Sequence, residues 1–287
     1  MTFDILLDGL LTGGVYALAA LGYVMVFKSS HILNLAYGQM VAVSAYVLYW
    51  LLTSVGVPTW LGILLLFAFG AALGFIVEML AIRPLLGQSF LMLLMMTLML
   101  GFLFQGIIIL IWGVESFNMP FTPTGMLTIG EWQVSPATTW GFAVCLGVFL
   151  LLTLVFRYTK IGLAMRVVAA DHEVAQSLGI RVRRMFSLSW VASGFLAAVV
   201  GILVGMVWMV TPSLGEIVLG KGLPVLILGG LDSVPGALVG GLIIGLVEPL
   251  GGYWAPAVRD VVPWIVMLVI LLVRPYGLFG QRDIERI

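Results

Sequence analysis

The chain consists mainly of long apolar runs separated by short polar segments, and this pattern constrains its fold more than any other feature. The runs lie near residues 5–27, 36–53, 60–82, 91–113, 138–156, 186–210, 217–231, 236–252 and 261–275. A helix needs about 20 apolar residues to cross a bilayer, and helices satisfy their own backbone hydrogen bonds there. With 62% hydrophobic and 9% charged residues, a soluble domain is excluded. The sequence predicts an all-α, polytopic transmembrane helical bundle, with residues 1–287 forming a single transmembrane domain.

Two of the nine runs, 217–231 and 261–275, are too short to span a bilayer comfortably, since each has 15 residues. Short segments that are interrupted by glycine or proline are often half-helices or re-entrant elements, because a broken backbone is tolerated at membrane depth only where it is buried or lines a cavity. We therefore expect eight or nine membrane segments, some of them broken or re-entrant.

A polar loop at residues 157–184 fixes the orientation of the chain. It holds six of the 13 basic residues, namely Arg157, Lys160, Arg166, Arg181, Arg183 and Arg184. Basic residues remain on the cytosolic side of a membrane during insertion, so this loop is predicted to be cytosolic.

The other polar segments agree with that orientation. Residues 114–137 contain two glutamates and no lysine or arginine, so they are expected outside, and the N-terminus carries Asp4 and Asp8 without a basic residue. That start does not resemble a signal peptide, and we expect the first segment to be retained. Lys28 and Arg83 are placed inside, as are the basic residues of the C-terminal tail, Arg274, Arg282 and Arg286. An outer N-terminus and an inner C-terminus favour nine crossings.

The cytosolic loop contains the signals of a short helix. Asp171 is a good N-cap, and Gly179 stands where a left-handed residue would end the helix. Between them, Val174, Ala175 and Leu178 are expected to form a small apolar face. Because a membrane protein does not need such an element in order to span, we interpret it as a docking helix for a cytosolic partner. A solvated connector is the alternative.

Two interruptions of the apolar pattern, at residues 28–39 and 229–236, occupy corresponding places in the two halves of the chain. Paired breaks of this kind point to a translocation path. The predicted path residues are Asn34, Tyr37, Gly38, Gln39, Gly229, Gly230, Asp232, Ser233 and Gly236. The alternative is close helix packing, since glycines recur at intervals of four residues, as at Gly9 and Gly13.

The ionisable residues near the apolar runs do not form a proton relay or a catalytic set. Glu78 is expected to pair with Arg83, and Glu248 is also expected to pair near a helix end. Glu216, Lys221 and Asp260 are the other ionisable residues close to the apolar runs.

Sequence motifs for catalysis or cofactor binding are lacking. Residues 215–222 nearly match a phosphate-binding loop, but Gly222 replaces the hydroxyl residue that would hold magnesium. A single cysteine, Cys145, and two histidines, His31 and His172, give no basis for a disulfide or a metal site. We expect no enzymatic activity, no cofactor and no nucleic-acid partner.

The chain resembles the permease subunit of a branched-chain amino-acid ABC transporter, of the LivH type, over nearly its whole length. The resemblance is carried by GLLTGGVYALAALGYVMVFKSSHILNLAYGQM, EMLAIRPL, GLAMRVVAADHEVAQSLGIRVRR, LPVLILGGLDSVPGALVGGLIIGLVE and RPYGLFG. It implies an importer of the cell inner membrane in which the chain pairs with a second permease subunit, two ATPase subunits hydrolyse ATP, and a substrate-binding protein delivers the solute.

The resemblance also implies a role for the cytosolic loop, as the coupling helix that contacts the ATPase. The corresponding residues are Ala169, Ala170, Asp171, Val174, Ala175, Leu178 and Gly179. This sequence has Tyr37 where the family more often has histidine, and similar permeases carry urea, short amides or aromatic acids, so the solute stays open. A secondary carrier or a passive channel, neither driven by ATP, is the alternative function.

Overall fold

The computed structural model describes residues 2–123, 125–129 and 132–280 of the chain, and each of the nine apolar runs forms a helix in it. These helices are α1 (Thr2–Ser30), α2 (Tyr37–Thr53), α3 (Thr59–Val77), α4 (Phe90–Trp112), α5 (Pro136–Tyr158), α8 (Val182–Val207), α9 (Leu214–Gly229), α10 (Val234–Trp254) and α11 (Val262–Val273). The predicted polytopic helical bundle is confirmed.

Shorter elements join these helices. The cytosolic loop forms α6 (Lys160–Ala170) and α7 (His172–Ser177), and α3 continues through a π-helical turn, η1 (Glu78–Ile82), and a 3₁₀ turn, η2 (Arg83–Leu85). Another 3₁₀ turn, η3 (Pro256–Val258), precedes α11. The segment between α4 and α5 contains a small antiparallel hairpin of β1 (Leu127–Ile129) and β2 (Trp132–Val134), which the sequence did not predict.

Six helices of the described chain are long and apolar enough to cross a membrane, namely α1, α3 with its continuation, α4, α5, α8 and α10. The predicted short segments are indeed short, since α9 has 16 residues and α11 has 12. Helix α2 is also short, with 17 residues, because the chain is not helical from His31 to Ala36. The prediction of nine crossings remains a prediction.

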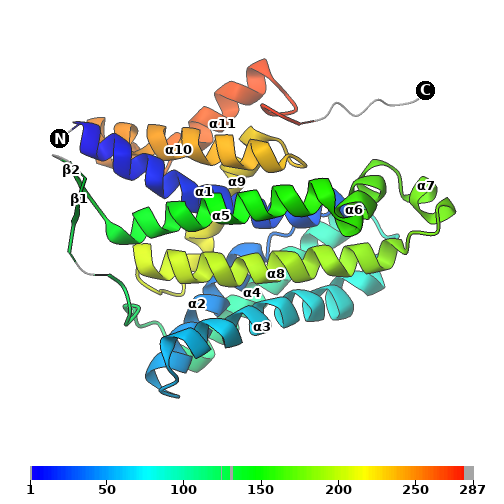
Figure 1. Ribbon diagram of the computed structural model, residues 1–287, viewed down its shortest axis with the longest axis horizontal. Helices are drawn as coiled ribbons and strands as arrows, with labels where there is room; N and C mark the ends of the chain where they lie inside the picture. The colour runs from blue at the N-terminus through cyan, green and yellow to red at the C-terminus, as the bar shows by residue number, and fades with distance from the viewer. Residues whose placement is uncertain (1, 124, 130–131, 281–287) are drawn as a thin grey trace.

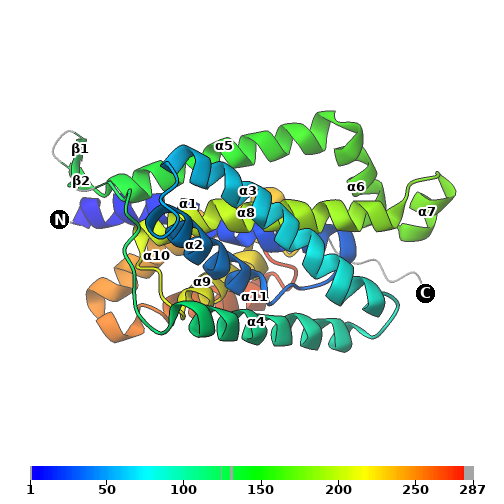
Figure 2. The same cartoon turned by 90° about the horizontal axis from the view of Figure 1, so that it is seen from below.

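Helix α1 lies in the centre of the bundle, with α5, α8 and α10 around it (Figures 1 and 2). In its most apolar window 83% of the residues are buried, against 17% in α4 and in α5. Glycines allow α1 to approach α10 closely, since a Cβ atom on Gly13 would lie 2.7 Å from the Gly241 carbonyl oxygen. The predicted glycine-mediated packing is present here. The apolar outer faces of α4 and α5 are left for lipid or another subunit.

The two ends of the bundle differ in the way that the charge pattern predicted. The start of α1 and the β1–β2 hairpin lie at one end, and α6 and α7 lie at the other (Figure 1). We call these the outer and inner ends, following the positive-inside rule. Of the tail residues predicted to be inside, Arg274 follows α11, while Arg282 and Arg286 lie outside the described residues.

Candidate functional site

The cytosolic loop folds as the sequence predicted, because both of its helices carry N-terminal caps. The Thr159 hydroxyl accepts a hydrogen bond from the Gly162 N–H at 3.0 Å and begins α6. The Asp171 carboxylate accepts from the Glu173 N–H at 2.8 Å and from the next N–H at 3.1 Å, and begins α7. Gly179, with φ +76°, ends this segment. The predicted start and end of the helix are confirmed.

The predicted apolar face of α7 needs a correction. Ala175 is fully buried against the chain itself, because the helix rests on α6 and α8. The residues that surround it are Met165, Val168, Met185 and Phe186. Val174 and Leu178, by contrast, are 49% and 66% exposed. Ala170 is exposed and Ala169 half-buried. Ala175 therefore anchors α7 to its own subunit. Ala169, Ala170, Val174 and Leu178 keep part or most of their surface exposed.

The last turn of α1 connects α7 with the α9–α10 break. The His172 Nε2 atom, at the start of α7, lies 3.3 Å from the Ser29 carbonyl oxygen, and the rings of His172 and His31 are 6.0 Å apart. On its other side, the Lys28 ammonium donates a hydrogen bond to the Asp232 carbonyl oxygen at 3.1 Å. The cytosolic helix and the second break are thus both in contact with residues 28–31.

The first break, from His31 to Ala36, is held by side chains. The Asn34 side chain is fully buried, and its Oδ1 atom accepts a hydrogen bond from the Ala36 N–H at 3.2 Å. Thr97 of α4 supplies the other partner, since its hydroxyl accepts from the Leu35 N–H at 3.2 Å and lies 3.2 Å from the Leu33 carbonyl oxygen. Asn34 therefore stabilises the loop locally.

The start of α2 places polar atoms in the middle of the bundle. The Tyr37 ring is buried and packs edge-on against Tyr23, with centroids 4.7 Å apart. Neither the Tyr37 hydroxyl nor the Gln39 Oε1 atom has a hydrogen-bond partner among the described residues. Gly38 and Gln39 abut Gly215 in the first turn of α9. Gly38 and Gln39 therefore contact the beginning of α9 rather than the α9–α10 break, and Tyr37 contacts Tyr23 of α1.

The α9–α10 break is held mainly by backbone groups. Gly229 and Gly236 are in backbone contact, and Gly230 has φ +107°. The buried Ser233 hydroxyl accepts from the Gly236 N–H at 3.0 Å, while the Phe279 N–H donates to the Gly229 carbonyl oxygen at 3.0 Å. In the described structure, Lys28, in the last turn of α1 just before the first break, donates a hydrogen bond to the second break. That the two breaks line one shared path stays a prediction.

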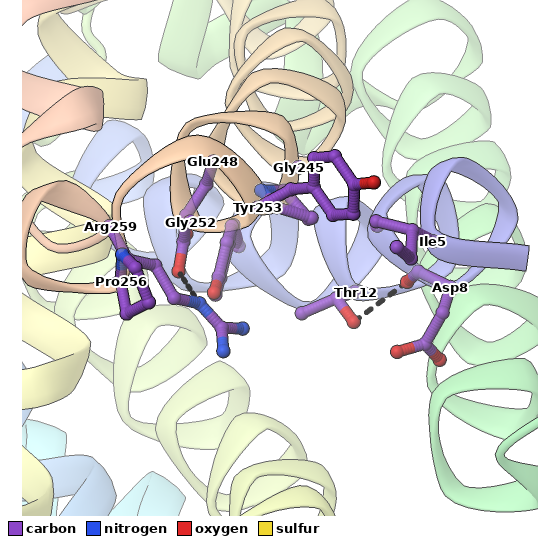
Figure 3. A pocket seen from close by; sticks show the side chains of 12 residues that line it. Ile5, Asp8, Thr12, Gly245, Glu248, Gly252, Tyr253, Pro256 and Arg259 are labelled. Atoms are coloured by element: carbon purple, nitrogen blue, oxygen red, sulfur yellow. Dashed lines mark hydrogen bonds and ion pairs between the residues drawn. The ribbon is translucent and has the colours of Figure 1, made fainter. Parts of the chain in front are cut away.

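A cavity of about 480 Å³ lies at the outer end, between the start of α1 and the end of α10 (Figure 3). Asp8 and Thr12 line it from α1, Glu248 and Tyr253 from α10, and Arg259 from the turn before α11. Its wall therefore carries both negative and positive groups.

A network of ion pairs borders this cavity. The sequence predicted that Glu248 would be paired, but it did not predict the partners. The Lys221 ammonium, in α9, lies 3.0 Å from Glu248 Oε1 and 2.9 Å from Asp260 Oδ1. The Arg259 Nε atom lies 3.2 Å from the same Glu248 oxygen. Glu248 is only 2% exposed, so it requires such partners. The hydrogen bond from Lys221 lowers the pKa of Asp260, which lies between α10 and α11.

The predicted pair of Glu78 and Arg83 is confirmed at the inner end. Arg83 Nη2 lies 2.8 Å from Glu78 Oε2, and the Ser187 hydroxyl of α8 donates to the same oxygen at 3.0 Å. Residues 215–222, which resembled a phosphate-binding loop, lie within α9. This segment is therefore helical and does not form a loop.

Comparison with known proteins decides the family. Residues 5–271 match the family described as "Branched-chain amino acid transport system / permease component". The chain belongs to this permease family. It is 30% identical to the high-affinity branched-chain amino acid transport system permease protein LivH of Escherichia coli (strain K12), over 98% of this chain and 96% of that protein. The permease protein BraD of Pseudomonas aeruginosa is likewise 30% identical, over 98% and 97%.

Two more distant comparisons agree with this assignment. A probable branched-chain amino acid transport permease protein LivH of Methanocaldococcus jannaschii is 30% identical over 96% of this chain and 92% of its own length. PsaBC from Streptococcus pneumoniae, solved in complex with Fab, has a TM-score of 0.51 at 12% identity, covering 95% of this chain and 92% of that one. The latter likeness concerns the fold alone. As a permease of this family, the chain is a multi-pass membrane subunit of an ABC importer and is not itself catalytic.

Proposed function

We propose that this permease imports branched-chain amino acids across the inner membrane, driven by ATP hydrolysis in two cytosolic ATPase subunits. A second permease subunit would complete the membrane channel, and a substrate-binding protein would deliver the solute to the outer end. The proposal is supported by the printed names of the relatives, which are branched-chain amino acid transport permeases similar over almost the entire chain. The charged cavity at the outer end lies on the side from which a binding protein would approach.

The observation that carries the coupling role is the exposure of α7. This helix is capped at its start and anchored by Ala175, yet it presents Val174 and Leu178 at the inner end of the bundle. Val174 and Leu178 are four residues apart and therefore adjoin on the helix surface, and contiguous exposed apolar side chains, rather than single ones, point to an interaction site. We propose that the coupling surface consists of Ala169, Ala170, Val174 and Leu178. Asp171 and Gly179 would fix the ends of the helix, and Ala175 would hold it against α6 and α8.

A shift of α7 would reach the membrane through residues 28–31. His172 touches the Ser29 carbonyl oxygen, and Lys28 holds the Asp232 carbonyl oxygen, so a displacement of α7 acts on the end of α1 and on the α9–α10 break together. This is a contiguous set of contacts of the kind that carries coupling between sites.

The solute path is proposed to run beside the start of α2. Buried polar atoms are almost always hydrogen-bonded, and the Tyr37 hydroxyl and Gln39 Oε1 lack a partner among the residues that the structure describes. Water or a passing solute would satisfy them. Asn34 supports the loop that positions both side chains, and the residues of the second break, Gly229, Gly230, Asp232, Ser233 and Gly236, would move with Lys28.

The coupling surface can be tested by comparing Leu178→Arg with Gln176→Arg. Both positions are exposed and both variants add the same charge, but only Leu178 belongs to the proposed surface. We expect Leu178→Arg to reduce co-purification of the ATPase subunits by about tenfold, since a charge in an apolar contact must be desolvated, and Gln176→Arg to leave it unchanged. Equal recovery of the ATPase with both variants would contradict the proposal.

A further inference from the structure

A second cavity, of about 320 Å³, lies at the inner end of the bundle and has basic residues in a mainly apolar lining. Four helices contribute to it, α1, α5, α6 and α10. Its lining consists of Lys28, Thr153, Phe156, Arg157, Arg166, Val234 and Pro235. Three of these seven side chains are cationic, and none is acidic. The function proposed above uses Lys28 but assigns no role to the cavity itself.

The positive charge of the cavity is only partly balanced by the protein. Lys28 donates to the Asp232 carbonyl oxygen, and the Asp232 carboxylate is near enough to act on it electrostatically. Arg157 and Arg166 are exposed, and within the described residues neither has a carboxylate within ion-pairing distance. Arg166 also adds to the positive potential at Lys28. A site with three cations and one nearby carboxylate attracts an anion.

The position of the cavity along the membrane normal indicates which anion could bind there. Lys28 lies two residues before the end of α1, and Arg157 one residue before the end of α5. Basic residues at the ends of spanning helices lie at the level of the lipid headgroups. Below them, Phe156 and Pro235 give the cavity an apolar wall, and the Lys28 ammonium lies 5.7 Å from the centre of the Phe156 ring.

We propose that this cavity binds the phosphate of an anionic phospholipid from the cytosolic leaflet. Arg157 and Arg166 would bind the phosphate oxygens, for which guanidinium groups are well suited, while Lys28 adds charge and the apolar wall receives the glycerol and the first acyl carbons. Basic cavities between membrane helices on the cytosolic side recognise lipid headgroups in this way. Because Arg166 lies in α6, which leads into α7, the lipid would connect these two cytosolic helices to α1 and α10.

The test uses the full chain in detergent and measures its thermal midpoint as phosphatidylglycerol is added. The variant Arg157→Gln/Arg166→Gln removes two cavity charges. The matched control Lys160→Gln/Arg181→Gln removes two exposed basic residues of the same loop that do not line the cavity. We expect the first pair to weaken the apparent lipid affinity by about 30-fold, since each basic residue near an anionic surface contributes about fivefold. The control pair should weaken it by less than about threefold.

Two further experiments distinguish lipid binding from the binding of other anions and from a folding defect in the variants. Phosphatidylcholine should stabilise the chain much less than phosphatidylglycerol, and inorganic phosphate at the same concentration should not stabilise it. The variant Arg157→Lys/Arg166→Lys keeps the charges and should bind phosphatidylglycerol within about fivefold of the wild type. Equal weakening in the two glutamine pairs, or equal stabilisation by inorganic phosphate, would overturn the proposal.

Discussion

The two breaks in the helical bundle occupy corresponding places in the two halves of the chain, but different groups satisfy their backbone hydrogen bonds. At the first, from His31 to Ala36, the side chains of Asn34 and Thr97 satisfy the backbone. At the second, between α9 and α10, glycines let the two helices meet and the backbone of the C-terminal segment supplies the hydrogen bonds, as from Phe279 to Gly229.

This difference indicates which break can move more easily. A side-chain hydrogen bond can be exchanged for one to water or solute at little cost, whereas a close backbone contact between glycines leaves no space for adjustment. We therefore expect the first break to change conformation when the solute passes. The second break should act as a rigid joint, keeping its own structure and moving together with Lys28. The predictions below separate these two roles.

The largest expected effect is at the rigid joint. A Cβ atom on Gly229 would overlap the carbonyl oxygen of Gly236, so Gly229→Val must push α9 and α10 apart. We expect a loss of about 3 kcal/mol in stability, measured as a drop in the thermal midpoint of the purified chain. Gly220→Ala, in the same helix with no atom within 4 Å of the added carbon, should be neutral or slightly stabilising. A drop in the thermal midpoint no larger for Gly229→Val than for Gly220→Ala would show that the joint is not tightly packed.

A smaller effect is expected at the first break. Thr97→Val keeps the shape of the side chain but leaves the partly buried Leu35 N–H without its acceptor, which costs about 2 kcal/mol. Thr97→Ser retains the hydroxyl and should cost less than half as much. Both values would come from the same thermal unfolding assay. If valine and serine prove equivalent, the hydroxyl does not hold this break.

The smallest effect is expected at the cap of α10. Ser233→Ala removes the acceptor of the Gly236 N–H and should cost about 1 kcal/mol, as N-cap losses do. Ser89→Ala, at the longer 3.4 Å cap of α4, provides the comparison and should cost less. A larger loss for Ser89 would mean that the α10 cap contributes little beside the glycine contacts.

Local features of this fold were predictable from the sequence. The apolar runs predicted the helices, and the caps at Asp171 and Gly179 marked the ends of the cytosolic helix, because capping depends on residues a few positions apart. Charge placement predicted which segments share each end of the bundle. The pair of Glu78 and Arg83 was also predictable, since its members are separated by little more than one helical turn.

Features that depend on which helices are neighbours were not predictable. The burial of Ala175 follows from the packing of α7 on α6 and α8, and the ion pair of Lys221 with Glu248 follows from the packing of α9 on α10. Opposite charges inside two apolar runs were the available signal for the latter. Thr97 lies 62 residues from the backbone group that it satisfies, and no periodicity in the sequence relates the two.

The central claim, that this permease works in an ATP-driven importer, is tested most directly by leucine uptake into proteoliposomes. The permease would be reconstituted with its ATPase partners, a second permease and the binding protein, with the ATP concentration held constant. We predict uptake that a proton uncoupler does not change and that stops when the ATPase subunits are inactivated by mutation. Uptake that persists with inactive ATPase subunits and collapses with the uncoupler would contradict the account and identify a secondary carrier.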